Sequence, residues 1–315
     1  AGRLTMAQVA DVHDGFANAM KLTCTTADTS IGASEYFILQ HKFEGQDVQQ
    51  LKKGSSDAEE FTVSFYVKGN ASATYVVEMY DLDNNRQVGK TFSVTTSWTR
   101  VVLTFPADTT GAFDDDNAAS LQLGIWLHAG SNYTSGTLNS SAFAANTSAQ
   151  RAGGITSFFD STDRTFFLTG LQLEVGSQAT PFEHRSYGDE LTLCQRYFET
   201  SYPSGYSAGH NFNDVYPFNT SKPVAQNYIA SDDTTTAISY PFMVNKRASP
   251  TVTIYSAKDG TSGQAWTYKG TGGTDANDAL NVIQTREQSM MLGCSLGAVN
   301  QASEKYFHYT ASSEL

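Results

Sequence analysis

The sequence predicts an all-β protein made of two β-sandwiches joined by a short helix. Three observations lead to this fold class. Short segments that alternate strictly between apolar and polar residues recur along the chain, which is typical of antiparallel strands with one buried face. Hydrophobic residues make up 40% of the 315 residues and charged residues only 17%, a mixture that favours sheets joined by many turns. One good helix signal occurs, close to residue 190.

The first strands are expected between residues 61 and 175. The segment TYVVEMYD precedes a turn at 81–85, and TFSVTTSWTRVVLTFP reads as two strands, or one bent strand, that end at Pro106. In each clearly alternating segment one set of residues should face the core. These inward residues are Phe61, Val63, Phe65 and Val67; Leu121, Leu123, Ile125 and Leu127; and Phe167, Leu171, Leu173 and Val175.

The helix signal follows the last of these strands. Pro181 prevents the strand from continuing its ladder. Ser186 and Asp189 have the spacing of a capping box, in which each residue satisfies a free backbone donor at the start of a helix. A stripe at helical spacing should then bury one face of this helix against the sandwich. The stripe consists of Leu191, Cys194 and Phe198.

Strand patterns resume beyond the helix and predict a second, smaller β-sandwich. The segments AQNYIAS, TTAISYPFMV, SPTVTIYSA, QAWTYKG, LNVIQTREQSMMLGCSL and EKYFHYTAS are separated by turn-rich stretches. We therefore expect a first domain at 1–185, a linking helix at 186–200 and a second domain at 201–315.

Charge and cysteine content exclude several classes of protein. The chain has 20 Lys and Arg against 32 Asp and Glu, a net charge of −12, which argues against binding to nucleic acid. No apolar run is long enough for a membrane helix, and the start AGRLTM shows no signal peptide. Three cysteines cannot all pair, so we expect free, mostly buried thiols rather than a disulfide scaffold.

Motifs of catalysis are missing. The sequence contains no H-E-x-x-H, C-x-x-C or G-x-S-x-G. GKT at 89–91 lacks the first glycine of a phosphate loop, because Asn84 stands there, and is expected to be a surface turn. The six histidines lack the spacing of metal ligands. We therefore expect no enzymatic activity.

Two acidic turns are candidate calcium sites. Calcium prefers several oxygen ligands, and DLDNN and DDDN supply clustered carboxylates and amides. The alternative is a solvated hairpin turn, since Asp and Asn favour turns without any ion. The candidate metal ligands are Asp81, Asp83, Asp114 and Asp116.

The sheet faces opposite the predicted core form a candidate glycan-binding site. A sugar ring packs on a flat apolar surface while polar groups bind its hydroxyls. Alternatively, these aromatic residues pack against a neighbouring subunit or lie beneath the long loop 129–154. The candidate residues are Tyr66, Glu78, Tyr80, Trp126, His128 and Gln172.

Much of the chain resembles bacteriophage virion proteins, particularly tail-fibre and head-fibre proteins. The resemblance is most specific in GLQLEVGSQATPFEHRSYGDELTLCQRYFE, while FILQHKFEGQDVQQL, FTVSFYVKGNASATYVVEMYDLDN and DTTGAFDDDNAASLQLGIWLHAGS are similar to the preceding strands of that module. KRASPTVTIYSAKDGTSG and YFHYTASSEL are similar to a small β-domain that follows it. The resemblance implies a jelly roll similar to carbohydrate-binding modules and transfers no catalytic residue. The longer N-terminal region that anchors such proteins to the particle is absent from this sequence.

The resemblance and the residues together give two main hypotheses. The first is a virion structural protein, a tail or head fibre that is assembled in the host cytoplasm and displayed on the particle. It would form a homotrimer with other virion proteins as partners, and would contact host-surface glycans or a neighbouring virion protein. The alternative is a secreted, non-catalytic carbohydrate-binding module of a polysaccharide-degrading system. A jelly-roll enzyme is a third and disfavoured hypothesis.

Overall fold

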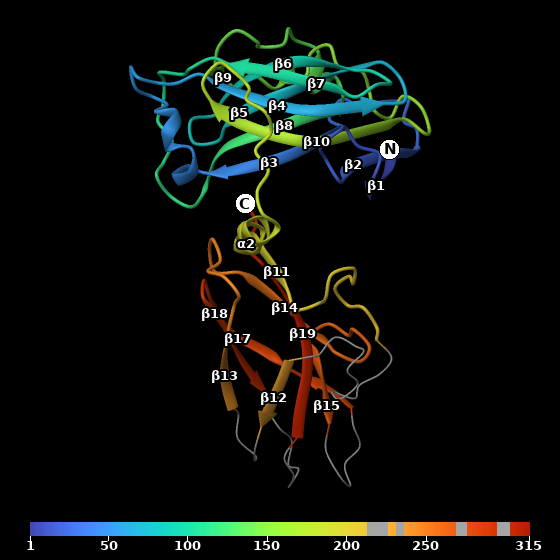
Figure 1. The fold of residues 1–315 in the computed structure, drawn as a ribbon, viewed down its shortest axis with the longest axis vertical. Coiled ribbons are helices and arrows are strands. Elements are labelled where there is room, and N and C mark those ends of the chain that lie inside the picture. The colour runs from blue at the N-terminus through green and yellow to red at the C-terminus, as the bar shows by residue number, and fades with distance from the viewer. Residues whose placement is uncertain (213–225, 231–235, 269–275, 295–302) are drawn as a thin grey trace. The chain divides into compact units, whose positions relative to one another are not determined.

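The computed structural model describes the chain except for residues 213–225, 231–235, 269–275 and 295–302 (Figure 1). The chain divides into two compact units, Ala1–His184 with Leu315, and Arg185–Glu314. Strands dominate both units, so the predicted all-β fold class is confirmed. That residues 1–185 and 201–315 fold as independent domains stays a prediction.

The N-terminal unit is a jelly-roll β-sandwich of two five-stranded antiparallel sheets (Figure 1). The first, here called the β4 sheet, contains in spatial order β1 (Arg3–Val9), β2 (Ala19–Thr26), β10 (Thr165–Val175), β4 (Phe61–Gly69) and β7 (Thr99–Phe105). The second, the β8 sheet, contains β3 (Tyr36–Glu44), β8 (Ala119–Ala129), β5 (Ala73–Asp81), β6 (Arg86–Val94) and β9 (Ala144–Ala145). Short helical turns lie in the connections: η1 (Gly45–Asp47), η2 (Gln49–Leu51), α1 (Ser131–Thr134) and η3 (Ser148–Gln150).

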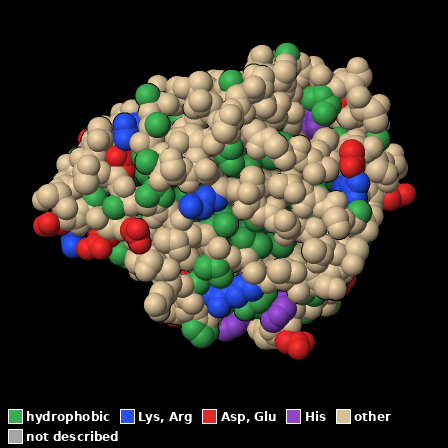
Figure 2. All heavy atoms as spheres, turned by 90° about the horizontal axis from the view of Figure 1, so that it is seen from above, with side chains coloured by type: hydrophobic (Ala, Val, Ile, Leu, Met, Phe, Trp, Pro, Cys, Tyr) green, Lys and Arg blue, Asp and Glu red, His purple; other side chains and the backbone are tan. Residues whose placement is uncertain are grey.

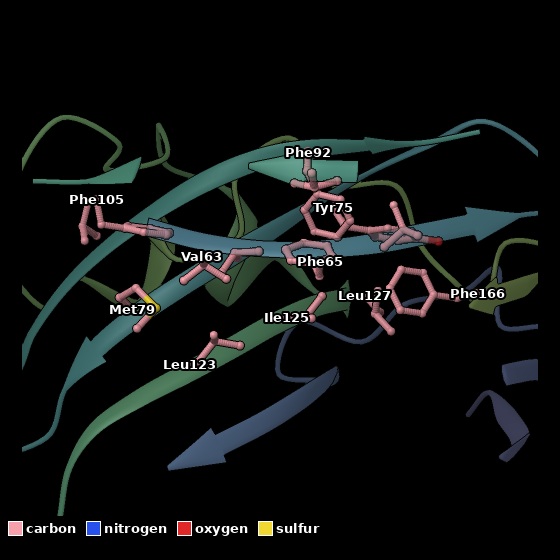
Figure 3. Packing of buried hydrophobic residues seen from close by; sticks show 14 of the residues in the cluster. Val63, Phe65, Tyr75, Met79, Phe92, Phe105, Leu123, Ile125, Leu127 and Phe166 are labelled. Carbon is pink, nitrogen blue, oxygen red and sulfur yellow. The ribbon is translucent and has the colours of Figure 1, made fainter. Parts of the chain in front are cut away.

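The core of this unit lies between the two sheets and follows the predicted alternation on two strands. On β4 and β8 all eight residues expected to face inward are buried in a single cluster. Figure 3 shows residues of this cluster, among them Phe65 of β4 and Tyr75, Leu123 and Ile125 of the β8 sheet. Burial of such side chains stabilises by about 1.5–3 kcal/mol each, so these faces hold the sandwich together.

On β10 the predicted register is wrong for part of the strand. Phe166 and Leu168 pack into the core and Phe167 does not belong to the core cluster, whereas Leu173, opposite Val63, packs against the core as predicted. Leu171 and Val175 are 37% and 42% exposed. The pairing with β4 shifts between Thr169 and Gln172. Gly170 lies in this bulge with φ +61°, a conformation that favours glycine. Because a bulge inserts one residue, it exchanges the inward and outward faces.

The second unit has its own hydrophobic core between a six-stranded and a three-stranded sheet. In the larger sheet β19 (Ser303–Ser312) pairs with four neighbours, and β15 also pairs with β16 (Ala276–Ala279). The neighbours of β19 are β11 (Phe198–Thr200), β12 (Gln226–Ala230), β14 (Thr251–Ser256) and β15 (Gln264–Tyr268). The smaller sheet contains β13 (Thr236–Pro241), β18 (Ser289–Cys294) and β17 (Asn281–Arg286).

The predicted helix forms as α2 (Tyr187–Tyr197), and the half of the predicted capping box that Ser186 supplies is present. The Ser186 hydroxyl accepts a hydrogen bond from the Asp189 backbone N–H and donates one to the Asp189 carboxylate. The expected burial of its stripe is wrong. Leu191 is 41% exposed, Cys194 is exposed, and Phe198 is 43% exposed and lies beyond the helix.

The C-terminal end of α2, rather than an apolar face, attaches this helix to the second unit. The carbonyl of Gln195 accepts from Lys246 Nζ at 2.5 Å, and that of Arg196 accepts from the Ser313 hydroxyl at 3.0 Å. Lys246 also pairs with the buried Glu199 at 2.6 Å. The last carbonyls of a helix have no partner within it, and here the second unit supplies those partners. Among the described residues no helix is long and apolar enough to cross a bilayer.

Candidate functional site

The structure separates the six predicted glycan-binding residues between two sheets. Glu78 and Tyr80 lie on β5, and Trp126 and His128 on β8, all in the β8 sheet. Tyr66 and Gln172 lie on β4 and β10 in the β4 sheet. As predicted, the positions of Trp126 and Tyr66 alternate with core residues. Because the core lies between the sheets, the two groups face opposite sides of the sandwich and cannot bind one sugar together.

The outer face of the β8 sheet is buried beneath residues 130–155, here called the covering loop. Trp126 is 1% exposed and packs in a second apolar cluster with Ala152, Tyr133 and Leu138 of this loop. The loop is fastened to the sheet edge, because β9 pairs with β6 and the Gly89 N–H donates to the Asn139 carbonyl at 2.7 Å. A side chain at Gly89 would meet Leu138 at 3.0 Å, so the glycine leaves room for the loop.

An ion pair closes this covered face. Arg151 of the covering loop donates to both carboxylate oxygens of Glu78 at 2.7 Å, and the Trp126 indole N–H donates to the same carboxylate at 2.9 Å. The Arg151 guanidinium also lies over the rings of Tyr80 and Trp126, at 4.7 and 5.0 Å. Burial alone would lower the pKa of Arg151, but its bonds to Glu78 raise that pKa.

These contacts correct the expectation of an exposed aromatic platform on this sheet. Glu78 is 1% exposed and its carboxylate is already bonded to Arg151 and Trp126. The Tyr80 hydroxyl donates to the Asn85 side chain at 2.6 Å. Of the two alternatives, burial beneath the long loop is the one observed for Trp126. Glycan binding by Trp126 or Glu78 would require the loop to open.

The outer face of the β4 sheet is partly open and carries an aromatic cluster, here called the open-face cluster. Its members are His13, Phe16, Tyr66, Phe182 and His184, whose neighbouring rings lie 4.1–5.4 Å apart. Of these, the Tyr66 ring stacks on His13 at 4.1 Å, and His184 is exposed.

Gly170 helps to form this cluster. A Cβ atom at this residue would lie 2.5 Å from the Phe16 ring, so the glycine of the β10 bulge lets Phe16 approach the strand. The same residue thus changes the register of β10 and makes space for an aromatic ring on the outer face. Any other residue at position 170 would clash with the Phe16 ring and would also strain the backbone.

Polar side chains adjoin the open-face cluster. Arg100 lies over the Tyr66 ring at 5.9 Å and donates to the Ser64 hydroxyl at 3.4 Å. The Gln172 side chain donates to the Thr180 hydroxyl at 3.3 Å. Although burial alone would raise it, hydrogen bonds from Thr180 and Gln172 lower the pKa of Glu174, so this group is a carboxylate at neutral pH. Aromatic rings, a cation, an amide and a carboxylate therefore share one face.

Sequence patterns did not identify several residues of these two faces. His13, Phe16, Phe182 and His184 lie outside strands, where alternation gives no information about direction. Arg151 can be identified from the sequence, because it is the single charged residue between 130 and 155. An isolated charge in such a loop suggests a specific partner.

Three of the four predicted calcium ligands, Asp81, Asp83 and Asp116, make contacts within the protein. Asp81 is fully buried and pairs with Lys53 at 2.5 Å. Asp83 accepts from the Asp114 backbone N–H at 3.0 Å, and Asp116 accepts from the Ala118 N–H at 2.8 Å. Asp83 and Asp116 thus have the turn-stabilising contacts of the alternative hypothesis, and Asp81 is part of a buried ion pair.

Lysine and arginine are dispersed on the visible surface. On the face that Figure 2 shows, these side chains lie singly or in small groups, several of them beside Asp or Glu. A surface that binds the nucleic acid backbone clusters such residues along one stripe, and this face has none.

Comparisons with known proteins give no family for this chain. No family model and no curated protein matches the sequence. Among solved structures, the chain is similar to a family 4 carbohydrate-binding module with 13% identity, a TM-score of 0.29, and coverage of 55% of this chain and 77% of that one.

It is also similar to the CBM22-1 xylan-binding domain from Paenibacillus barcinonensis, with 15% identity, a TM-score of 0.30, and coverage of 57% and 86%. A third similar structure is the enzymatically active domain of tailspike protein 4 of bacteriophage CBA120, with 12% identity, a TM-score of 0.31, and coverage of 56% and 18%. Similarities this weak do not transfer a function to the chain.

Proposed function

We propose that this chain is a non-catalytic structural protein of a bacteriophage particle that binds glycans through the outer face of its β4 sheet. The virion role rests on the resemblance of residues 170–199 to phage fibre proteins. The glycan role rests on one observation, the open-face cluster around Tyr66 with Arg100, Gln172 and Glu174 beside it. Tyr66 and Gln172 are the two predicted glycan ligands on this partly open face.

The chemistry of this face suits a carbohydrate. The C–H face of a sugar ring packs on aromatic rings, and its hydroxyls bind to amide, guanidinium and carboxylate groups. A partly exposed patch of aromatic side chains is typical of interaction surfaces. A single such site binds weakly, but copies linked on one particle raise the effective concentration of the next site. We also propose that the chain forms a homotrimer and contacts other virion proteins. Structural calcium bound at the acidic turns is a further, separate part of this proposal.

A glycan array with purified full-length chain tests the binding site. We expect Tyr66→Ala and Gln172→Ala each to weaken binding at least tenfold, which corresponds to about 1.4 kcal/mol. Tyr187→Ala is a matched control, because Tyr187 is 79% exposed on α2 and lies outside the proposed site. The site is rejected if both variants bind every glycan as the unchanged chain does.

If the chain is instead a secreted carbohydrate-binding module, we expect the same sheet face to bind glycans but a different oligomeric state. Light scattering after size-exclusion chromatography separates the two. A fibre protein is expected at three times the mass of one chain, whereas a single module is expected as a monomer. A monomer at micromolar concentration would contradict the trimeric fibre. The glycan site would not be affected by this result, because the glycan array tests it separately.

A further inference from the structure

Three potential metal ligands meet at one end of the β8 sheet, away from the acidic turns. Asp28, Glu35 and His128 each offer a ligand atom, and these atoms all lie within 4.8 Å of one another. This is the one such group among the residues that the structure describes. His128 is far from Asp28 and Glu35 in sequence, so no spacing motif identifies the group. His128 was a predicted glycan ligand, and its neighbours indicate another role.

Backbone hydrogen bonds hold all three residues in place. Asp28 lies in the connection from β2 to β3, and its N–H donates to the Phe159 carbonyl at 2.7 Å. Glu35 immediately precedes β3, and its carbonyl accepts from the Gly130 N–H at 2.8 Å. His128 is paired opposite Phe37 in the β3–β8 ladder. The backbone of the group is therefore fixed by the sheet and by the loops around it.

The imidazole of His128 is oriented as in a metal site. Its Nδ1 forms a hydrogen bond with the Ser157 hydroxyl at 2.7 Å, and the ring packs edge-on against Phe159 at 5.2 Å. The side chain is 3% exposed, and Nε2 has no hydrogen-bond partner among the described residues. A hydrogen bond to one ring nitrogen fixes the direction in which the other points.

A pocket of about 320 Å³ gives access to this group. Asp28, Glu35 and His128 line it together with Gly2, Tyr36 and Phe159. Histidine binds a metal ion as the neutral imidazole.

The two carboxylates are oriented by backbone donors. Asp28 accepts from the N–H groups of Gly2 and Ser30 at 3.1 and 3.2 Å, and Glu35 accepts from Gly32 at 2.6 Å. Two carboxylates at this separation repel each other unless a cation lies between them. A bound metal ion would supply that positive charge.

We propose that Asp28, Glu35 and His128 bind a divalent first-row transition metal ion, with Zn²⁺ as the best match. One imidazole and two carboxylates suit Zn²⁺, whereas Ca²⁺ prefers oxygen ligands throughout. Metal–ligand bonds of about 2.0–2.2 Å require these atoms to move together by about 1 Å. The three ligands leave a coordination position open toward the pocket. The proposal is independent of the glycan site on the other sheet.

Calorimetric titration of the chelator-treated full chain with Zn²⁺ alone tests the proposal. We expect one Zn²⁺ per chain, and Glu35→Gln should weaken binding at least tenfold. Glu35 is partly exposed, so this variant should fold. His128→Gln should have a comparable effect. The matched controls Asp57→Asn and His41→Gln remove an exposed acidic and an exposed histidine side chain outside the proposed sites and should leave the affinity unchanged.

Cobalt gives a spectroscopic check, because the visible absorption of Co²⁺ reports its coordination by nitrogen and oxygen ligands. We expect a visible band on addition of Co²⁺ that Zn²⁺ removes and that is absent in Glu35→Gln. The proposal is overturned if no stoichiometric Zn²⁺ binds. It is equally overturned if folded Glu35→Gln binds Zn²⁺ like the unchanged chain, or if Ca²⁺ displaces Zn²⁺ from the site.

Discussion

The two outer faces of the N-terminal sandwich differ in what lies over them. On the β8 sheet, Trp126 and Glu78 are each 1% exposed beneath the covering loop. On the β4 sheet, Tyr66 is partly exposed, and Val102 in the neighbouring strand is 47% exposed. Both faces have the same alternation in sequence. Alternation shows which side chains point away from the core, but not whether another segment covers them.

Because one outer face is covered and the other is open, similar aromatic residues have different roles on the two sheets. An aromatic ring beneath a loop contributes to stability, because its removal leaves a cavity. An aromatic ring on an open face contributes little to stability and remains available for a ligand. Two substitution experiments test this distinction, and a third extends it to the second unit. They are given in order of decreasing expected effect.

Truncation of the two aromatic residues should give unequal losses of stability. We expect Trp126→Ala to lower the free energy of unfolding of the N-terminal unit by about 3–5 kcal/mol. Tyr66→Ala should lower it by about 1 kcal/mol, because its ring is already partly solvated. Hydrogen exchange measured by mass spectrometry reports the two units separately. Equal losses in the two variants would show that the faces do not differ.

Removal of the charge that closes the covered face should also be costly. Arg151→Met keeps the apolar part of the side chain but leaves the buried Glu78 carboxylate without its cation. We expect a loss of about 3 kcal/mol, the lower end for a broken buried ion pair, because Arg151 reaches solvent.

Lys52→Met is the matched control for this ion pair. Lys52 pairs with Glu59 at 2.9 Å, with side chains 53% and 42% exposed, so its loss should cost far less than the loss of Arg151. The same exchange measurement applies to both variants. A similar small loss in Arg151→Met would mean that the covering loop is not held by this contact.

The second unit also contains a polar residue that points away from the core but is buried. His308 of β19 is 1% exposed, stacks on Tyr202 at 4.2 Å, and its Nδ1 forms a hydrogen bond with the Ser201 hydroxyl at 3.1 Å. Its Nε2 is buried without a partner among the described residues. Burial lowers the pKa of His308 to about 4.

Acid should therefore destabilise the second unit. The folded pKa lies below the unfolded value of about 6.5, so the unfolded chain binds the proton more tightly and stability falls as pH falls from 6.5 toward 4. We expect a loss of about 2 kcal/mol between pH 7 and pH 5. Hydrogen exchange of β19 at both pH values, after correction for intrinsic rates, measures it. His308→Phe should remove most of this dependence, and an unchanged slope in that variant would assign it to other groups.

Local sequence rules predicted the strands and the helix well where a residue depends on its neighbours in the chain. The alternation of β4 and β8 and the cap of α2 at Ser186 are examples. The same rules failed at β10, because the bulge at Gly170 inserts one residue and exchanges the faces of the strand. They also failed for the stripe on α2, since spacing cannot show whether a surface is present for Leu191 to pack against.

The sequence by itself determined that the chain is all-β and which side chains of β4 and β8 point into the core. The surface turn predicted at 89–91 is wrong, because these residues lie within β6 and pair with β5. Only the tertiary structure decided which outward side chains are covered, and it brought Asp28, Glu35 and His128 together. The physical reason is the range of the interactions. Alternation and capping depend on residues close in the chain, whereas coverage and ligand convergence depend on loops and strand pairings between residues far apart in it.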